Sequence, residues 1–160
     1  MPTRSSDNDT ALAPDAPAAT EYERDFYSWA LEQARLVREG RWAAVDRENV
    51  AEEIECLGRE QFAKLRSALH VLLMHMLKWD HQPKRRSRSW VLSIQAQRIE
   101  LEDVLDGNPG LKPRIAEAIG KAYRGALIGA MQETGLAKKD FPEQCPYTFD
   151  EITTREFLPP

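Results

Sequence analysis

The chain has 160 residues, 42% of them hydrophobic and 30% charged, with a formal net charge of −4. This length is typical of one domain with its own core, and the acidic balance excludes an overall positive field that would recruit nucleic acid or acidic membranes. With two cysteines we expect no disulfide framework, and without a long apolar stretch we expect neither a membrane-spanning helix nor a signal peptide. We therefore expect a cytoplasmic protein with no membrane partner.

The N-terminal residues divide into a tail and a helix. Residues 1–20 are rich in Ala, Pro, Asp, Ser and Thr, with too little bulky apolar surface to offset the entropy of ordering, so we expect a disordered tail. One helical domain is then expected over residues 21–160. Its first helix is predicted over residues 21–39, ended by Gly40 as a C′ glycine. Apolar residues at steps of three and four mark one face of this helix: Tyr22, Phe26, Trp29, Ala30, Leu36 and Val37.

The second helical region begins at Asp46, a good N-cap residue. One apolar stripe keeps its register across Gly58, which favours a continuous helix over residues 47–79. The alternative is that Gly58 caps one helix and a second begins at once. The stripe consists of Val50, Ile54, Leu57, Leu65, Leu72, Met76 and Trp79. Residues 69–79 are apolar nearly all round, so we expect them at the centre of the core or against a partner.

Two further helices are expected after Pro83. Ser87 or Ser89 caps the first of them, which extends to about Asp106. The last long helix begins near Leu111, tolerates Pro113 in its first turn and ends at Gly135. A ridge of small residues along it predicts a tight crossing with another helix of the same chain: Ala118, Ala122, Gly125, Ala126 and Gly129.

The C-terminal residues are too apolar for a free tail. Thr148 and Glu151 form a capping box for a short helical turn, and the aromatic residues around it are expected to strap across the bundle. The predicted fold class is therefore all-α, a bundle of four or more helices with a short helical turn and an extended C-terminal tail packed on it.

Five ordered motifs carry a resemblance to a known family. They are "YERDFYSWALEQARLVREGRW", "VDRENVAEEIECLGRE", "LLMHMLKW", "RSRSW" and "FPEQCPYTFDEI". Together they resemble the bacterial family called domain of unknown function 29, over roughly residues 21–158. The resemblance implies a small helical bacterial protein and supplies no activity, ligand or catalytic residue.

The sequence gives little support for a metal site or for acid–base catalysis. His70 and His75 point about 140° apart on a helix, so they do not share one ion. His75 and His81 come together only if the helix end bends, so we predict no metal site and no cofactor. The carboxylates of Glu48, Glu52 and Glu55 share one helical face, which a solvated surface explains. Cys145 stands alone, and a structural role is favoured over a reactive thiol.

The strongest candidate for a functional site is the basic stretch of residues 78–88, which lies close to two tryptophans, Trp79 and Trp90. Five cations lie within eleven residues: Lys78, Lys84, Arg85, Arg86 and Arg88. Guanidinium groups bind phosphates, and exposed aromatic rings stack on bases, so a candidate nucleic-acid site lies at Lys84, Arg85, Arg86 and Arg88. The favoured interpretation is a solvated inter-helix loop whose arginines bind carbonyls at a helix end.

Two function classes follow from these features. The favoured one is a non-enzymatic interaction or regulatory module with a homodimer or another protein as partner. The alternative is a nucleic-acid-associated protein, including a small nuclease, that uses the basic loop 84–88 with His81. Residues 46–60 carry six acids and two bases, whereas residues 78–88 carry five bases and one acid. These opposite charges would pair in an antiparallel dimer if the long helix is continuous.

Overall fold

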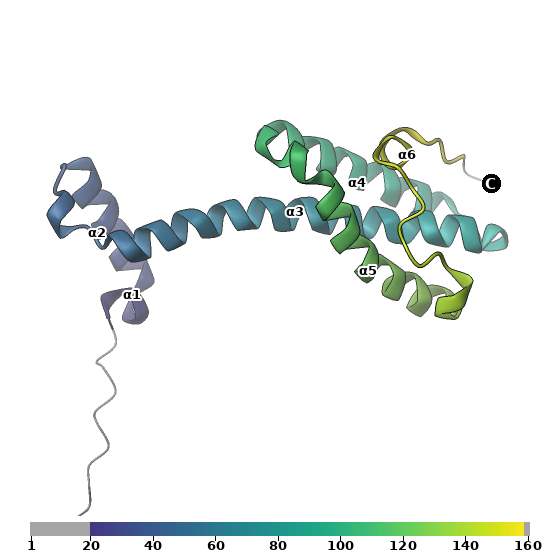
Figure 1. Ribbon diagram of the computed structural model, residues 1–160, viewed down its shortest axis with the longest axis horizontal. Coiled ribbons are helices and arrows are strands. Elements are labelled where there is room, and N and C mark those ends of the chain that lie inside the picture. Colours follow the sequence, from purple (N-terminus) through teal and green to yellow (C-terminus); the bar gives the residue numbers. More distant parts are fainter. Residues whose placement is uncertain (1–19, 159–160) are drawn as a thin grey trace, which may run out of the picture. The chain divides into compact units, whose positions relative to one another are not determined.

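Helices account for every regular element over residues 20–158, the part of the chain that the computed structural model describes (Figure 1). The α-helices are α1 Glu21–Arg24, α2 Phe26–Arg38, α3 Arg47–His81, α4 Arg88–Gly107, α5 Ile115–Thr134 and α6 Phe149–Thr154. Short 3-10 helices connect them: η1 Trp42–Ala44, η2 Pro83–Arg85, η3 Pro109–Arg114 and η4 Lys138–Asp140. The all-α prediction is confirmed.

The described residues divide into two compact units, and the boundary lies inside α3, between Glu53 and Ile54. The expected single domain over residues 21–160 stays a prediction. The disordered tail expected over residues 1–20 lies outside the described residues except for Thr20. That residue is the N-cap of α1, where its side chain accepts a hydrogen bond from the backbone N–H of Glu23.

The single helix predicted over residues 21–39 is wrong, because Asp25 interrupts it. The backbone of Asp25 has φ −147° and ψ 80°, so it ends α1 and begins α2. Its carboxylate accepts a hydrogen bond from the backbone N–H of Ser28 at 3.0 Å, which satisfies one of the first free donors of α2. Gly40 does end α2 as predicted, with a φ of +69° that suits glycine at this position.

The N-terminal unit is held by an aromatic cluster and by hydrogen bonds that connect α1 and α2 to α3, one of them from the Tyr22 hydroxyl to the carboxylate of Glu53. The rings of Tyr22, Phe26 and Trp29 lie 4.7–5.8 Å apart, centre to centre. The indole N–H of Trp29 donates to the carboxylate of Asp46 at 3.2 Å, and the backbone N–H of Asp46 donates to Gln33 at 2.8 Å. These contacts fasten α2 to the start of α3. Of the described residues in this unit, only Trp29 and Leu36 are buried.

Helix α3 is continuous through Gly58, which confirms the favoured prediction. Asp46 caps it as expected, accepting a hydrogen bond from the backbone N–H of Asn49 at 3.3 Å. The predicted apolar stripe, however, is buried only in its second half. Leu65 and the stripe residues after it lie in the core, whereas Ile54 and Leu57 are exposed.

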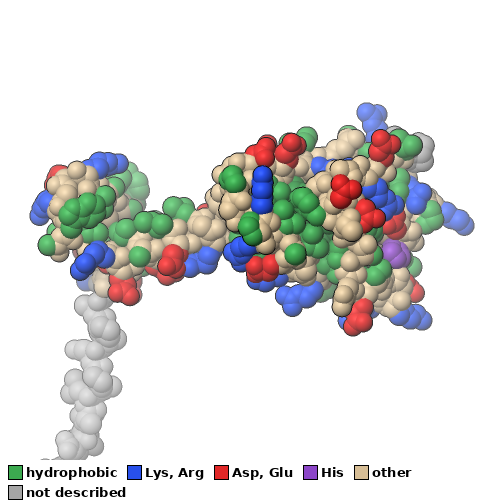
Figure 2. Space-filling model, turned by 45° about the horizontal axis from the view of Figure 1, so that its top comes forward, with side chains coloured by type: hydrophobic (Ala, Val, Ile, Leu, Met, Phe, Trp, Pro, Cys, Tyr) green, Lys and Arg blue, Asp and Glu red, His purple; other side chains and the backbone are tan. Residues whose placement is uncertain are grey.

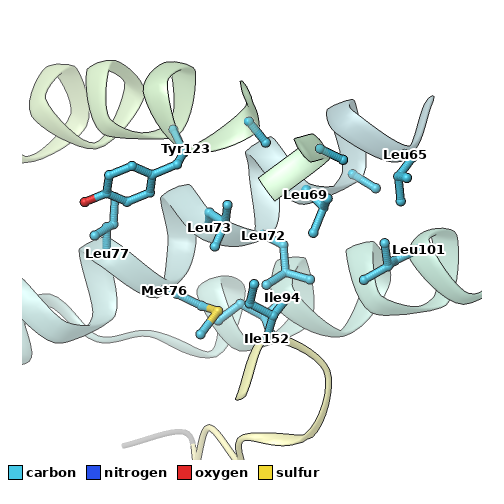
Figure 3. Close-up of a cluster of buried hydrophobic side chains, with 14 of the residues drawn as sticks. Leu65, Leu69, Leu72, Leu73, Met76, Leu77, Ile94, Leu101, Tyr123 and Ile152 are labelled. Atoms are coloured by element: carbon cyan, nitrogen blue, oxygen red, sulfur yellow. The ribbon is translucent and has the colours of Figure 1, made fainter. Parts of the chain in front are cut away.

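The core of the C-terminal unit surrounds the second half of α3. In this unit α4 returns along α3 and α5 crosses it (Figure 1). Figure 3 shows leucines of α3 packed with Ile94 of α4, Tyr123 of α5 and Ile152 of α6. The side chains of Leu69, Leu72, Leu73, Met76 and Leu77 are fully enclosed by the chain's own helices. The idea that segment 69–79 meets a partner is therefore wrong, while its expected place in the core is confirmed.

The small-residue ridge of α5 packs against α3, as predicted. Ala118, Ala122 and Ala126 are buried, and a Cβ atom at Gly129 would lie 2.7 Å from the sulfur of Met74. The start of α5 was predicted four residues too early. Residues 109–114 form η3 instead, because Pro113 has no N–H for an α-helical hydrogen bond and its ring crowds the preceding turn.

The tail packs on the bundle, as expected. Thr148 and Glu151 form the predicted capping box at the start of α6. Phe141, Ile152 and Phe157 are buried among residues of the helices, and the ring of Phe157 meets that of Trp79 edge to face at 5.4 Å. The tail is thus part of the core.

Candidate functional site

The basic segment, defined as Lys84, Arg85, Arg86 and Arg88, joins α3 to α4. Lys84 and Arg85 belong to η2, and Arg88 is the first residue of α4. Ser87 is the N-cap of α4, and its hydroxyl accepts a hydrogen bond from the backbone N–H of Trp90 at 3.4 Å. Lys84, Arg85 and Arg88 are exposed, whereas Arg86 is half-buried. Three of the four predicted site residues therefore face solvent.

The side chain of Arg86 contacts the C-terminal end of α3. Its Nε donates to the carbonyl oxygen of Trp79 at 3.0 Å, and its guanidinium lies 4.9 Å from the centre of the Trp79 ring. A carbonyl in the last turn of a helix has no partner within the helix, so an arginine here stabilises the end of α3. This is the helix-end role that the sequence favoured for the basic segment.

The other aromatic and cationic residues of the stretch are also used inside the unit. Lys78 is buried, pairs with Glu133 of α5 and lies 4.5 Å from the centre of the Trp90 ring. Trp79 is buried and Trp90 is half-buried. The indole of Trp79 therefore does not offer a stacking surface to a base. Nucleic-acid binding by Lys84, Arg85 and Arg88 stays a prediction.

Two of the three histidines hydrogen-bond within α3. The Nδ1 atom of His75 lies 2.9 Å from the Val71 carbonyl oxygen, and that of His81 lies 2.9 Å from the Leu77 carbonyl oxygen. Burial lowers the pKa of His75 below its ordinary value, which favours the neutral ring. His75 is buried at the edge of the core, whereas His70 and His81 are half-buried. Within residues 20–158, no three His, Cys, Asp or Glu side chains are placed to hold a metal ion.

A polar junction between α3 and the tail was missed by the sequence analysis. Both carboxylate oxygens of Asp80 accept hydrogen bonds from the Arg155 guanidinium, at 2.6 and 2.9 Å, and Tyr147 donates its hydroxyl to the same carboxylate at 2.8 Å. Burial works against the charged carboxylate, but these donors prevail and hold the pKa of Asp80 below its usual range. Arg98 of α4 adds hydrogen bonds to the carbonyls of Ile152 and Arg155, each at 2.8 Å.

The remaining candidates are the carboxylates at the start of α3 and the thiol of Cys145. Glu48, Glu52 and Glu55 are all exposed, so their face of α3 is solvated as expected. Cys145 is half-buried, and its Sγ lies 3.7 Å from the Tyr147 carbonyl oxygen. Burial raises the pKa of the Cys145 thiol, which disfavours the reactive thiolate.

Helix α2 carries a large exposed apolar surface, of which the sequence pattern marked only Phe26, Ala30 and Val37. We call it the α2 face: Phe26, Tyr27, Leu31 and Val37, with Ala30 and Ala34 between them. The four larger side chains are 51%, 73%, 55% and 38% exposed, respectively. On a helical wheel these residues span an arc of about 140°, adjacent to the arc that buries Trp29 and Leu36, and the exposed Arg38 in the last turn also falls within it. Figure 2 shows hydrophobic side chains at the surface of the N-terminal helices.

The family model described as "Domain of unknown function DUF29" matches residues 21–158. The chain belongs to the DUF29 family. This agrees with the five motifs in the sequence, and it leaves the function unknown because the family description names none. No curated protein and no solved structure matches this DUF29 chain. Over the described residues, no helix has the length and apolar character needed to cross a membrane.

Proposed function

We infer that this DUF29 chain is a non-enzymatic interaction module that forms a homodimer through the α2 face. The observation that carries the proposal is the exposure of Phe26, Tyr27 and Leu31 along one side of α2. An apolar arc of this width on a helix is normally covered by a neighbouring element. Two free cysteines, Cys56 and Cys145, fit a reducing compartment, so we place the module in the bacterial cytoplasm.

The size of the α2 face fits a modest dimer interface. With about 150–250 Å² per aromatic side chain, its exposed residues present on the order of 400 Å² of apolar surface. A standard interface covers about 800 Å² per partner, of which roughly 60% is non-polar. The α2 face therefore provides most of the apolar area that a dimer needs. Because its area is modest, we expect a dissociation constant of about micromolar order.

The residue pattern favours a second copy as the occupant. Ala30 and Ala34 lie on the midline of the α2 face, Leu31 lies at its edge between them, and larger residues lie at both ends of the helix. In an antiparallel pair of α2 helices, the alanines meet at the centre and Tyr27 lies opposite Val37 of the second copy. Small residues at the centre allow the two helices to approach closely.

Charges near this face do not oppose the pairing. Arg35 forms ion pairs with Glu32 at 2.6 Å and with Glu39 at 2.7 Å, all within its own helix or its cap. In the antiparallel arrangement Arg38 lies opposite the Phe26 ring of the second copy, a favourable cation–π geometry. The face therefore needs no oppositely charged partner.

Analytical ultracentrifugation tests the proposal with matched leucine variants. Leu31→Glu places a charge on the α2 face, and Leu92→Glu places one on α4, where the leucine is similarly exposed at 52%. We expect a concentration-dependent dimer for the unmodified chain and for Leu92→Glu, and a monomer for Leu31→Glu. A chain that stays monomeric at high micromolar concentration, or equal dimers for both variants, would overturn the proposal.

Salt separates this dimer from one built on opposite charges. Pairing between residues 46–60 and 78–88 would weaken in high salt, whereas burial of the α2 face would persist. The structure reduces the charge available for such pairing, because Lys78 pairs with Glu133 and Asp80 pairs with Arg155. A dimer that dissociates in high salt would contradict pairing through α2.

A further inference from the structure

We propose that a groove between α3 and α5 binds a small phosphate-bearing molecule. The groove has a volume of about 360 Å³, and we call it the basic groove. Its polar residues and the glycine on its wall are Arg66, Ser67, His70, Lys121, Arg124 and Gly125. All of them belong to the C-terminal unit, and the site is separate from both the basic segment and the α2 face.

The cations of the basic groove are not neutralised within it. Arg66 and Arg124 form no ion pair with any residue over 20–158, and no carboxylate from that part of the chain lines the groove. Lys121 pairs with Glu117 at 2.7 Å, but Glu117 also pairs with Arg114 at 2.9 Å. One carboxylate thus serves two cations, and the groove keeps an excess of positive charge that favours an anionic ligand.

His70 differs from the other two histidines of α3. His75 and His81 each place Nδ1 against the carbonyl oxygen four residues back. His70 makes no such contact, and its ring nitrogens hydrogen-bond to no residue of the described chain. Its half-buried ring lies against α5, where a Cβ atom at Gly125 would be 2.6 Å from its Nδ1. The glycine therefore provides the space that the imidazole occupies, and the ring's hydrogen-bonding capacity stays available to a ligand.

The side-chain types favour phosphate over other anions. Two guanidinium groups offer planar pairs of N–H donors that match phosphate oxygens, while Ser67 and His70 add single donors. The volume lies at the small end of the range for ligand sites. A phosphorylated metabolite or a free diphosphate would fill such a groove.

A nucleic-acid strand fits this groove less well. Tight binding of a strand requires several phosphate contacts along a continuous positive track. On α3, Glu60 lies three residues before Ala63, the first residue that lines the groove, and on α5 Glu117 lies four residues before Lys121. An acidic residue therefore interrupts the basic residues on each helix. Single-stranded DNA therefore serves as the competing ligand in the test.

Calorimetric titration of the full chain with inorganic pyrophosphate tests the proposal. The combined variant Arg66→Gln and Arg124→Gln is compared with a matched variant, Lys138→Gln and Lys139→Gln, which removes two exposed cations elsewhere in the same unit. Because charge-assisted hydrogen bonds to phosphate are strong, we expect the first variant to lose about tenfold or more in affinity and the second to change little. Circular dichroism verifies that both variants keep their helices.

Three outcomes would overturn the proposal. The first is no heat and no amide shift at Ser67 or Gly125 in NMR spectra with millimolar pyrophosphate. The second is an equal loss of affinity in both variants, which would indicate a general charge effect. The third is binding of a thymidine oligonucleotide without binding of pyrophosphate, which would make the ligand a nucleic acid.

Discussion

Replacing Gly58 by alanine should stabilise the protein. The glycine lies inside continuous α3, and a Cβ atom at this position would meet nothing within 4 Å. Glycine in a helix interior is less favourable than alanine by about 0.5–1 kcal/mol, because the unfolded chain loses more freedom on folding. With no contact to offset this gain, Gly58→Ala should raise the free energy of unfolding by about that amount. Thermal unfolding followed by circular dichroism should show an increase in Tm of roughly 1–4 °C.

Gly135→Ala provides the control for this prediction. Position 135 is equally open, but its φ is +73°, a conformation that alanine adopts at a cost of about 1 kcal/mol or more. The two substitutions add the same methyl group. Opposite changes in the free energy of unfolding would therefore depend on backbone conformation alone. A loss of stability in Gly58→Ala would refute the reasoning, because it would mean that α3 ends at this glycine or that another surface covers it.

Two further predictions concern the end of α3. Arg86→Ala should lower the free energy of unfolding by about 1 kcal/mol, because it removes the hydrogen bond to the Trp79 carbonyl oxygen. Arg85→Ala, at an exposed position, should change it little. Equal urea midpoints for the two variants would contradict this prediction. His75 should make the free energy of unfolding decrease as the pH is lowered. Burial lowers its folded-state pKa below the ordinary 6.5, so the unfolded chain alone gains a proton as pH falls through that value. Urea unfolding at pH 7.5 and 5.5 should show a smaller loss for His75→Gln than for the unmodified chain, and an identical loss would count against the assignment.

Local patterns in the sequence predicted the elements that depend on one helix at a time. The register of the apolar stripe across Gly58 identified α3 as continuous, and the all-round apolar run before Trp79 located the core. The break at Asp25 was missed, because aspartate also occurs within helices and only its cap geometry shows the interruption. Apolar periodicity likewise marked one side of α2 without showing which of its residues the rest of the chain covers.

Sites that combine distant segments gave weaker signals. Tyr147 and Arg155 lie 67 and 75 positions from Asp80, and no local spacing connects them. The basic groove left a partial signal, since Arg66 and His70 are four residues apart and Lys121 and Arg124 are three apart, each pair on one helical face. What the sequence did not show was that α3 and α5 cross at this point.

The junction between Asp80 and the tail has a consequence for synthesis. A ribosome produces the chain from the N-terminus, so the contacts within residues 20–53 are complete long before Phe157 is made. The C-terminal unit lacks Ile152 and Phe157 during most of that time, and the apolar surface of α3 around Trp79 stays open to water or to chaperones. The core around Trp79 therefore forms late, after Ile152 and Phe157 have left the ribosome.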